Sequence, residues 1–495
     1  MESRQLNGRA ALYTDVGEVT AQNVADVIGD VSGKWNSNRG DISYLYDYYR
    51  GVQPILDRTK TYNKEICNKV VENRAKEISD FKTGYLLSAP IQYIDARAND
   101  STETMENSDI ARLMEWMRSE GKDASDMEVA FWQSVCGTAY RMVSPRDGWT
   151  SSDATSPFQI IVLDPRYTYV VYSSSPDHRP VLGVTYYEDK DGNRTTYAYT
   201  ADTVFTIDKD GNVSARSHQM GQVPIVEYPS GPTRLGDFEP VIPMLDAINT
   251  TQSSRIDGVE QFVQAIMVLE GMDPGDLEQF MSDVKEMGAF RMPAGGKASY
   301  LTLDMDQTST QTLVDGMYNA VLKICGMPNP HAGFNTQDTG AAVILRDGWS
   351  ATEAVASRTE TWFKRSERRF LDMAIDFCDI AGGLSLEHKD VGIMFPRRNY
   401  TNDTSNVDNL TKLLSLDWIS PEQAFEHSNM FPDPHSEFLR AKAWHDEQES
   451  GTVARLTDVD AERERYAESG KENEDGSEGQ QQQQGAIGAD GGAAE

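Results

Sequence analysis

Two long helices separated by a short insertion are the feature of this sequence that most restricts its fold. The first helix is predicted from apolar side chains spaced mostly three and four residues apart, the pattern of one helical face. These residues are Val241, Leu245, Ile248, Ile256, Val259, Val263 and Ile266. Pro240 and Pro243 fall in the expected first turn, where a missing N–H costs least. Such a helix would reach about 40 Å at 1.5 Å per residue.

The opposite face of this helix is polar and mixed in charge, with Asp246, Asn249, Arg255, Asp257 and Glu260. A helix of this length with one apolar stripe has to pack against a neighbour. The neighbour is either the second long helix or the same helix of another subunit, and the pattern leaves both open.

The insertion and the second helix follow directly. Residues 267–308 are predicted to form a strand, a helix and a second strand, and the next helix runs from about 309 to 325 and ends at Gly326. A helical pattern resumes over about 339–379 and is interrupted at 346–350 (RDGWS). An Asp-Gly pair inside a helical pattern indicates a break or a looped-out turn.

The rest of the chain alternates between helical and strand patterns, which predicts an α+β fold. Residues 137–228 show a period of two and are predicted to form a mostly antiparallel sheet, with hairpin turns at Asp191-Gly192 and Asp210-Gly211. Short strands are expected near 88–93 and 391–395. Helices are predicted at 18–50 (two short ones), at 63–87, as a pair between 109 and 136, and at 406–416, 421–428 and 434–449.

The charge of the chain limits how it can meet nucleic acid. Its 495 residues carry a formal net charge of −32, which argues against a surface that wraps DNA but not against a channel that DNA passes without sticking. Neither a membrane span nor a signal peptide is expected, because no apolar run is long enough. The four cysteines lie far apart and are expected to be free thiols. The acidic, Gln-rich segment 450–495 is expected to be disordered.

The motifs of common enzymes are missing. The sequence holds no HExxH, no GxSxG and no CxxC pair. GGKAS at 295–299 resembles the end of a phosphate-binding loop, but the first glycine of that loop would stand at Arg291. The sequence therefore predicts no catalytic residue, no cofactor and no metal site.

Two repeated patterns have more than one interpretation. DKDGN occurs at 189–193 and again at 208–212; a calcium loop of the EF-hand type would need Glu where Thr200 and Gln219 stand, so hairpin turns are preferred. A basic cluster falls on the long helix after residue 350. It is a solvated helix face, or it pairs with acidic neighbours in an assembly, or it faces DNA phosphates. The cluster is Lys364, Arg365, Arg368 and Arg369.

Several stretches resemble the portal proteins of tailed double-stranded DNA bacteriophages, in the branch typified by Bacillus siphophage connectors. They occur in the order of that family and span about residues 48–441. The stretches are YYRGVQPILDR (48–58), NKVVENRAKEISDFKTGYLLSAPIQY (68–93), LDP (163–165) with VVYSSS, LGVTYYED (182–189), QVPIVEYPSG (222–231), GDFEPVIPMLDAINTTQSSRIDGVEQF (236–262) and the closing TKLLSLDWISPEQAFEHSNMFPDPHSEFLRA.

The resemblance implies a portal architecture with a wing, a stem, a clip and a crown. The implied divisions are an N-terminal segment (1–40), the α+β wing (41–236), stem helix 1 (237–266), the clip (267–308), stem helix 2 (309–328), a tunnel loop with the long wing helix (329–402), a helical crown (403–449) and the acidic tail (450–495). The small α/β clip is expected to gain its core between subunits.

Two groups of functional residues are implied by the same resemblance. The tunnel loop that touches DNA in the channel is expected at Arg346, Asp347, Gly348, Trp349 and Ser350. Docking of the motor and adaptor proteins is expected at the clip residues Met272, Leu277, Phe280 and Lys285.

The function that the resemblance implies is mechanical rather than catalytic. A ring of identical chains, expected to be a dodecamer, would sit at one vertex of the capsid, nucleate head assembly and conduct double-stranded DNA during packaging and ejection. Its expected partners are the terminase large subunit, a head-completion or adaptor protein, the major capsid protein and the scaffolding protein, with no membrane. It would be assembled in the host cytoplasm and remain in the virion.

Two other classes of protein remain as alternatives. One is another minor ring protein of the virion, which would lack the order of stem, clip and stem. The other is an acidic cytoplasmic enzyme with a helical cap, which predicts a concave site with convergent perturbed groups. Particle size separates the classes, because an enzyme of 55.1 kDa would run as a monomer to tetramer and a portal ring would exceed half a megadalton.

Overall fold

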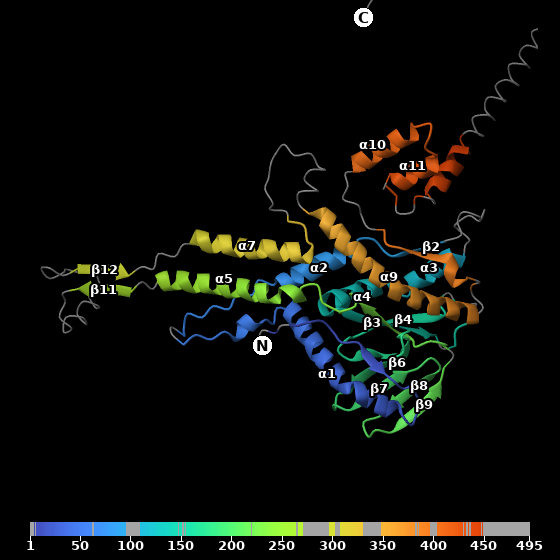
Figure 1. The fold of residues 1–495 in the computed structure, drawn as a ribbon, viewed down its shortest axis with the longest axis horizontal. Coiled ribbons are helices and arrows are strands. Elements are labelled where there is room, and N and C mark those ends of the chain that lie inside the picture. Colours follow the sequence, from blue (N-terminus) through green and yellow to red (C-terminus); the bar gives the residue numbers. More distant parts are fainter. Residues whose placement is uncertain are drawn as a thin grey trace, which may run out of the picture. The chain divides into compact units, whose positions relative to one another are not determined.

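The computed structural model describes residues 6–61, 64–95, 109–146, 155–218, 220–263, 266–270, 297–301, 307–329, 348–381, 386–396, 403–428 and 437–446, with a few single residues between them. By its internal contacts the chain divides into two compact units, Met1–Thr401 and Asn402–Glu495. Figure 1 shows the elements of both units. Taken over the whole chain they include helices and strands, as expected for an α+β fold.

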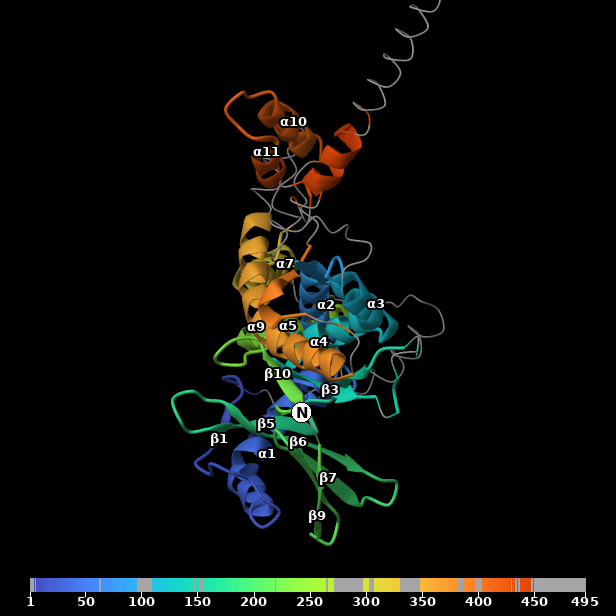
Figure 2. The ribbon, with the colours of Figure 1, turned by 90° about the vertical axis from the view of Figure 1, so that its right-hand side faces the viewer.

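Two sheets form the lower part of the first unit in Figure 2. The larger sheet has the strand order β1-β5-β6-β7-β8-β9, in which β1 and β5 are parallel and the other neighbours antiparallel. The smaller sheet has the order β10-β3-β4 and is antiparallel. The strands are β1 (Leu12–Thr14), β3 (Thr138–Pro145), β4 (Phe158–Leu163), β5 (Thr168–Ser173), β6 (Pro180–Glu188), β7 (Arg194–Tyr199), β8 (Thr203–Ile207), β9 (Val213–Ser217) and β10 (Ile225–Pro229).

The prediction of mostly antiparallel strands within 137–228 is confirmed, with two differences. The strands form two sheets rather than one, because β3, β4 and β10 pair among themselves. Strands β1 and β9 were not predicted. The first is only three residues long, and the second carries Ser, Ala and Arg in place of an alternating apolar pattern.

Both DKDGN repeats form hairpin turns, which confirms the interpretation preferred from the sequence. They join β6 to β7 and β8 to β9, and Gly192 and Gly211 take the positive φ angles, 78° and 84°, that such turns require. Asp189 accepts hydrogen bonds from the N–H groups of Asp191 and Asn193, at 2.9 and 2.8 Å. Its carboxylate is therefore used to close its own turn, and hydrogen bonds from Asn193 lower its pKa.

A single helix, α1 (Val24–Tyr49), replaces the two short helices predicted within 18–50. The helix contains Gly29, Gly33 and Gly40, but it keeps one face buried along its length. The buried apolar residues are Val24, Val27, Val31, Trp35, Ile42, Tyr44, Leu45 and Tyr48. Trp35 stacks on Tyr169 of β5, with 4.5 Å between the ring centroids. Packing on the larger sheet therefore outweighs the helix-breaking tendency of glycine.

The smaller sheet is covered by helices from distant parts of the chain. They are α2 (Arg74–Leu86), α3 (Asp109–Ser119), α4 (Lys122–Cys136) and α9 (Trp349–Ile380), of which α4 and α9 contact β3 and β10. Beside them, β2 (Gln92–Asp95) pairs with β13 (Val391–Met394), as expected for 88–93 and 391–395. Helix α2 begins eleven residues later than the predicted helix at 63–87, which is corrected accordingly.

The two long helices of the sequence lie side by side and leave this body together (Figure 1). Helix α5 (Ile242–Val263) follows a short 3-10 turn (Glu239–Val241), so Pro240 and Pro243 do occupy the first turns. Helix α7 (Gln307–Cys325) returns to the body. Between them, β11 (Ile266–Glu270) and β12 (Lys297–Leu301) form an antiparallel pair. The predicted strands of the insertion are thus confirmed, and its predicted helix lies outside the described residues.

The second unit is small and helical. Helix α10 (Asp403–Leu414) and helix α11 (Pro421–His427) are followed by helical residues at 437–446. Ser420 caps α11 in a capping box with Gln423, as its Ser-Pro-Glu-Gln start predicted. Phe425 packs on Phe431 and Phe438, with ring centroids 5.1 and 5.9 Å apart.

Candidate functional site

The helical hairpin made of α5, β11, β12 and α7 is the most prominent candidate for function. Its helices are joined by polar side chains: Arg255 of α5 donates to Gln311 at 2.7 Å and to Gln307 at 3.2 Å. At the base, Leu245, Ile248 and Val321 are buried. The hairpin is therefore anchored by an apolar base and tied by hydrogen bonds farther out.

Part of the polar face of α5 is buried, which the sequence pattern did not indicate. Asn249, Ser253 and Asp257 stand one turn apart and are almost fully buried. They accept hydrogen bonds from the backbone N–H groups of Glu72, Val70 and Asn68, at 2.8, 2.9 and 2.7 Å respectively. Residues 68–72, here called the extended segment, therefore run along this face of the helix.

The spacing of these hydrogen bonds follows from backbone geometry. Two residues of extended chain advance about 6.6 Å, and four residues of helix advance about 6 Å, so every second N–H meets every fourth side chain. Arg58 and Lys60 form ion pairs with the carboxylate of Asp257, with N···O distances of 2.9 and 2.5 Å. Burial alone would raise the pKa of Asp257, but these cations and the N–H of Asn68 outweigh it and hold the pKa at about 2.

Several apolar side chains of the hairpin are exposed in the part of the chain that the structure describes. The stripe predicted on α5 is buried at Val241, Leu245 and Ile248 but exposed at Ile256 and Val259. On α7, Leu313 is 57% exposed and Ile324 is 56% exposed. The described part of the chain therefore covers the stripe near its base and leaves Ile256 and Val259 exposed.

The expected tunnel loop is only partly within the described residues. Arg346 and Asp347 lie outside them. Gly348 precedes α9 with a φ of 87°, and Trp349 and Ser350 form the first turn of that helix.

Trp349 lies against α2 in this structure. Its ring centroid is 6.2 Å from that of Phe81 and 6.0 Å from that of Tyr85. Tyr85 also donates a hydrogen bond to Glu353 at 2.8 Å. The start of α9 is thus fixed to α2 at the point where the expected tunnel loop ends.

The expected docking residues of the clip cannot be placed. Met272, Leu277, Phe280 and Lys285 lie outside the described residues, which include only the strand pair β11–β12 of this region.

A buried group of charges joins three elements of the body, α4, β3 and α9. Lys122 and Asp126 of α4, Arg141 of β3 and Glu367 of α9 are almost fully buried. Lys122 contacts Asp126 at 2.5 Å and Glu367 at 2.9 Å, and Arg141 contacts Asp126 at 2.5 Å and also Glu367. We call these four residues the charge network. It holds two cations and two carboxylates, so it is formally neutral.

Two tyrosines complete the charge network. Tyr93 of β2 donates to Glu367 at 2.6 Å and Tyr228 of β10 at 2.9 Å. Burial would raise the pKa of Glu367, but Arg141, Lys122 and the hydrogen bond from Tyr93 hold it at about 2. Sequence reasoning missed this group, since Arg141 and Glu367 are 226 residues apart and have no local signal.

The basic cluster of α9 is only in part a solvated face. Lys364 pairs with Glu360 of the same helix at 2.6 Å, and Arg368 donates to the carbonyl oxygens of His388 and Val391. Burial lowers the pKa of Arg369. Arg365 is exposed and lies over the ring of Trp362. Lys364 and Arg368 therefore bind groups of their own chain.

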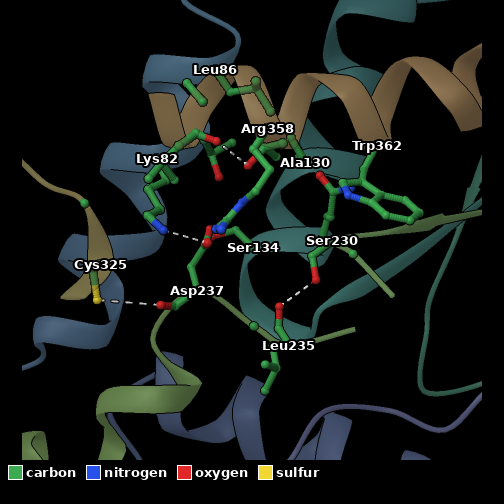
Figure 3. Close-up of a pocket in the computed structure, with 18 of the residues that line it drawn as sticks. Lys82, Leu86, Ala130, Ser134, Ser230, Leu235, Asp237, Cys325, Arg358 and Trp362 are labelled. Carbon is green, nitrogen blue, oxygen red and sulfur yellow. Dashed lines mark hydrogen bonds and ion pairs between the residues drawn. The ribbon is translucent and has the colours of Figure 1, made fainter. Parts of the chain in front are cut away.

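A cavity of about 290 Å³ lies at the base of α7, between α2, α4 and α9 (Figure 3). Asp237 is held there by Lys82 at 2.8 Å and by Ser134 at 2.7 Å. Cys325 donates to the carbonyl oxygen of Asp237, and burial raises the pKa of this thiol to about 12. A neutral thiol and a fully bonded carboxylate form a structural junction rather than a nucleophile with its base.

The described residues contain no group of three or more His, Cys, Asp or Glu residues arranged to hold a metal ion. Among their helices, none is long and apolar enough to cross a membrane.

Comparisons with known proteins cover the hairpin and most of both units. A family model described as phage portal protein, SPP1 Gp6-like, matches residues 29–451. The portal protein of Bacillus phage SPP1 is 20% identical over 431 residues, which cover 79% of this chain and 78% of the relative. Since the family model matches far more than half of the sequence, this chain belongs to the phage portal protein family.

Proposed function

We propose that copies of this chain form a closed ring at one vertex of the phage capsid and that double-stranded DNA passes through its centre. The observation that carries this proposal is the helical hairpin: two antiparallel helices leave the body together and end in a strand pair (Figure 1). In a ring, such hairpins stand side by side around one axis and form the wall of a channel. A heterologous contact that closes on itself produces a ring of this kind.

The charges of the hairpin suit a wall that DNA slides along. Helices α5 and α7 contain two basic residues, Arg255 and Lys323, against four acidic ones. Arg255 is engaged by Gln307 and Gln311. Proteins hold DNA mainly through Lys and Arg side chains that neutralise phosphates and release the counterions condensed on them, so a wall with few free cations would hold DNA weakly.

The family resemblance supplies the roles proposed for the tunnel loop and for the insertion. Residues 346–350 would touch DNA as a tunnel loop that ends in the first turn of α9, where Trp349 packs on α2. The insertion 267–308, with Met272, Leu277, Phe280 and Lys285, would dock the terminase large subunit and later the head-completion protein. The ring would also contact the scaffolding and major capsid proteins and would perform no chemistry.

The test is the mass and shape of the purified full-length protein. Twelve chains of 55.1 kDa give 661 kDa, which light scattering separates from a monomer or tetramer. Negative-stain electron microscopy should show rings with a central hole wide enough for a duplex. Particles of one to four chains, both alone and when produced together with the scaffolding and capsid proteins, would refute the ring.

A further inference from the structure

We propose that the cavity at the base of α7 binds a small monoanion with a flat apolar body, of the class of aromatic carboxylates. The cavity lies between α2, α4, α9 and the end of α7, and its volume is about 290 Å³ (Figure 3). This site goes beyond the proposed ring and does not depend on it, because every residue that lines it belongs to one chain.

One cation of the cavity is left without a partner. The cavity is lined by three charged side chains, Lys82, Asp237 and Arg358. Lys82 and Asp237 pair with each other at 2.8 Å. Within the part of the chain that the structure describes, the guanidinium of Arg358 forms neither a hydrogen bond nor an ion pair. Two cations and one carboxylate therefore leave a single positive charge in the wall of the cavity.

Arg358 is placed to meet a ligand. Its side chain extends from α9 into the cavity, towards Asp237 (Figure 3). The carboxylate of Asp237 is already bound by Lys82 and by the hydroxyl of Ser134, at 2.8 and 2.7 Å. A guanidinium presents several N–H donors in one plane, which matches the two oxygens of a carboxylate. Asp237 would repel a ligand with a second negative charge, so a monoanion is favoured.

A buried hydroxyl without a partner also belongs to the wall of the cavity. Thr83 of α2 is 8% exposed, and its Oγ1 atom has no hydrogen-bond partner among the described residues. Native structures leave few buried polar groups unpaired. Threonine populates two χ1 rotamers in a helix, so this hydroxyl can turn to a polar atom of a ligand.

The remaining wall determines the shape of the ligand. Apolar side chains from three helices line the cavity: Phe81 and Leu86 of α2, Ala130 of α4, and Val355 and Trp362 of α9. They suit a hydrophobic body, and the indole ring of Trp362 offers a flat face for stacking. An engineered cavity of about 150 Å³ binds benzene. A cavity of about 290 Å³ therefore has room for a body of two rings.

Equilibrium dialysis of the full-length protein with indole-3-acetate as the probe tests this site. The probe should bind at one molecule per chain. Its uncharged analogue, indole-3-acetamide, should bind at least fivefold more weakly, because the amide cannot neutralise Arg358. Binding is counted per chain and has the same meaning for rings and for single chains.

Two substitutions in the cavity separate the effect of charge from that of shape. Arg358→Gln should weaken binding of indole-3-acetate at least fivefold and make it equal to that of the amide. Trp362→Leu should weaken both probes by a similar factor, since it removes the flat wall and leaves the charge. The matched control is Arg118→Gln, which removes the same charge from an exposed position in the last turn of α3, outside the cavity. It should leave both affinities unchanged.

The outcomes separate this inference from the proposed function. A preference for the anion that Arg358→Gln removes and Arg118→Gln keeps supports the site. Absence of indole-3-acetate binding at millimolar concentrations overturns it, as does equal binding of the two probes or an equal loss in Arg358→Gln and Arg118→Gln. Rings that form normally while the probe fails to bind would leave the proposed function standing and remove this site.

Discussion

Replacement of Glu367 by glutamine should destabilise the body of this protein far more than the same change elsewhere on α9. Glu367→Gln keeps the shape of the side chain but leaves two buried cations, Arg141 and Lys122, with Asp126 as their sole carboxylate in the charge network. Removing one partner of a buried pair costs about 3–5 kcal/mol, since the remaining charge cannot be solvated.

The matched control is Glu360→Gln, two turns earlier on the same helix. Glu360 pairs with Lys364, whose side chain is 37% exposed. A pair that reaches solvent contributes about 1 kcal/mol or less. The difference between the two variants should therefore be at least about 2 kcal/mol in the free energy of unfolding.

The assay is urea unfolding followed by circular dichroism, with all variants at one protein concentration, because assembly adds to apparent stability. The double variant Arg141→Met, Glu367→Gln removes one charge of each sign, so it should lose less than the sum of its single changes. If Glu367→Gln unfolds within about 1 kcal/mol of Glu360→Gln, Glu367 is not the ionised centre described above.

Three further predictions concern single positions. The pKa of Asp257 lies at about 2 in the folded chain and near 3.9 when unfolded. About 2.6 kcal/mol of the free energy of unfolding is therefore present above pH 4 and lost as the pH falls towards 2. Urea unfolding of Asp257→Asn should lack this loss. Gly137→Ala should abolish soluble protein, because its Cβ would lie 2.0 Å from the carbonyl oxygen of Arg234, whereas Gly148→Ala, with a similar φ but open space, should remain soluble. Trp349→Ala should speed hydrogen exchange in the first turns of α9 about tenfold, the equivalent of about 1.4 kcal/mol, and Ser350→Ala should not; equal exchange in both would show that the contacts with Phe81 and Tyr85 do not fix this helix.

Local patterns in the sequence predicted the parts of the fold that local physics decides. The alternation within 137–228 and the two Asp-Gly turns predicted strands and hairpins correctly. The spacing of apolar residues and the prolines at 240 and 243 predicted α5, although Ile266, expected at its end, begins β11 instead.

Partners distant in the sequence decided the parts that were predicted wrongly. Ile66 and Val70 fit a helical pattern, but the backbone N–H groups of residues 68–72 are bound by α5 side chains about 180 residues later. Lys122 and Asp126 read locally as an ordinary surface pair four residues apart, and only Arg141 and Glu367 bring them into the charge network. No local pattern contains this information.

The contact between the extended segment and α5 restricts substitutions differently on its two sides. Segment 68–72 contributes backbone N–H groups at positions 68, 70 and 72, which every residue except proline possesses. The helix contributes side-chain oxygens, which only a few residue types can supply at the right reach. In a deep mutational scan, Val70 should therefore accept most substitutions except proline, whereas Asn249, Ser253 and Asp257 should accept very few. Substitution at Val70 would leave its hydrogen bond to Ser253 intact, whereas Asn68 and Glu72 also bind α5 through their side chains and should be less tolerant.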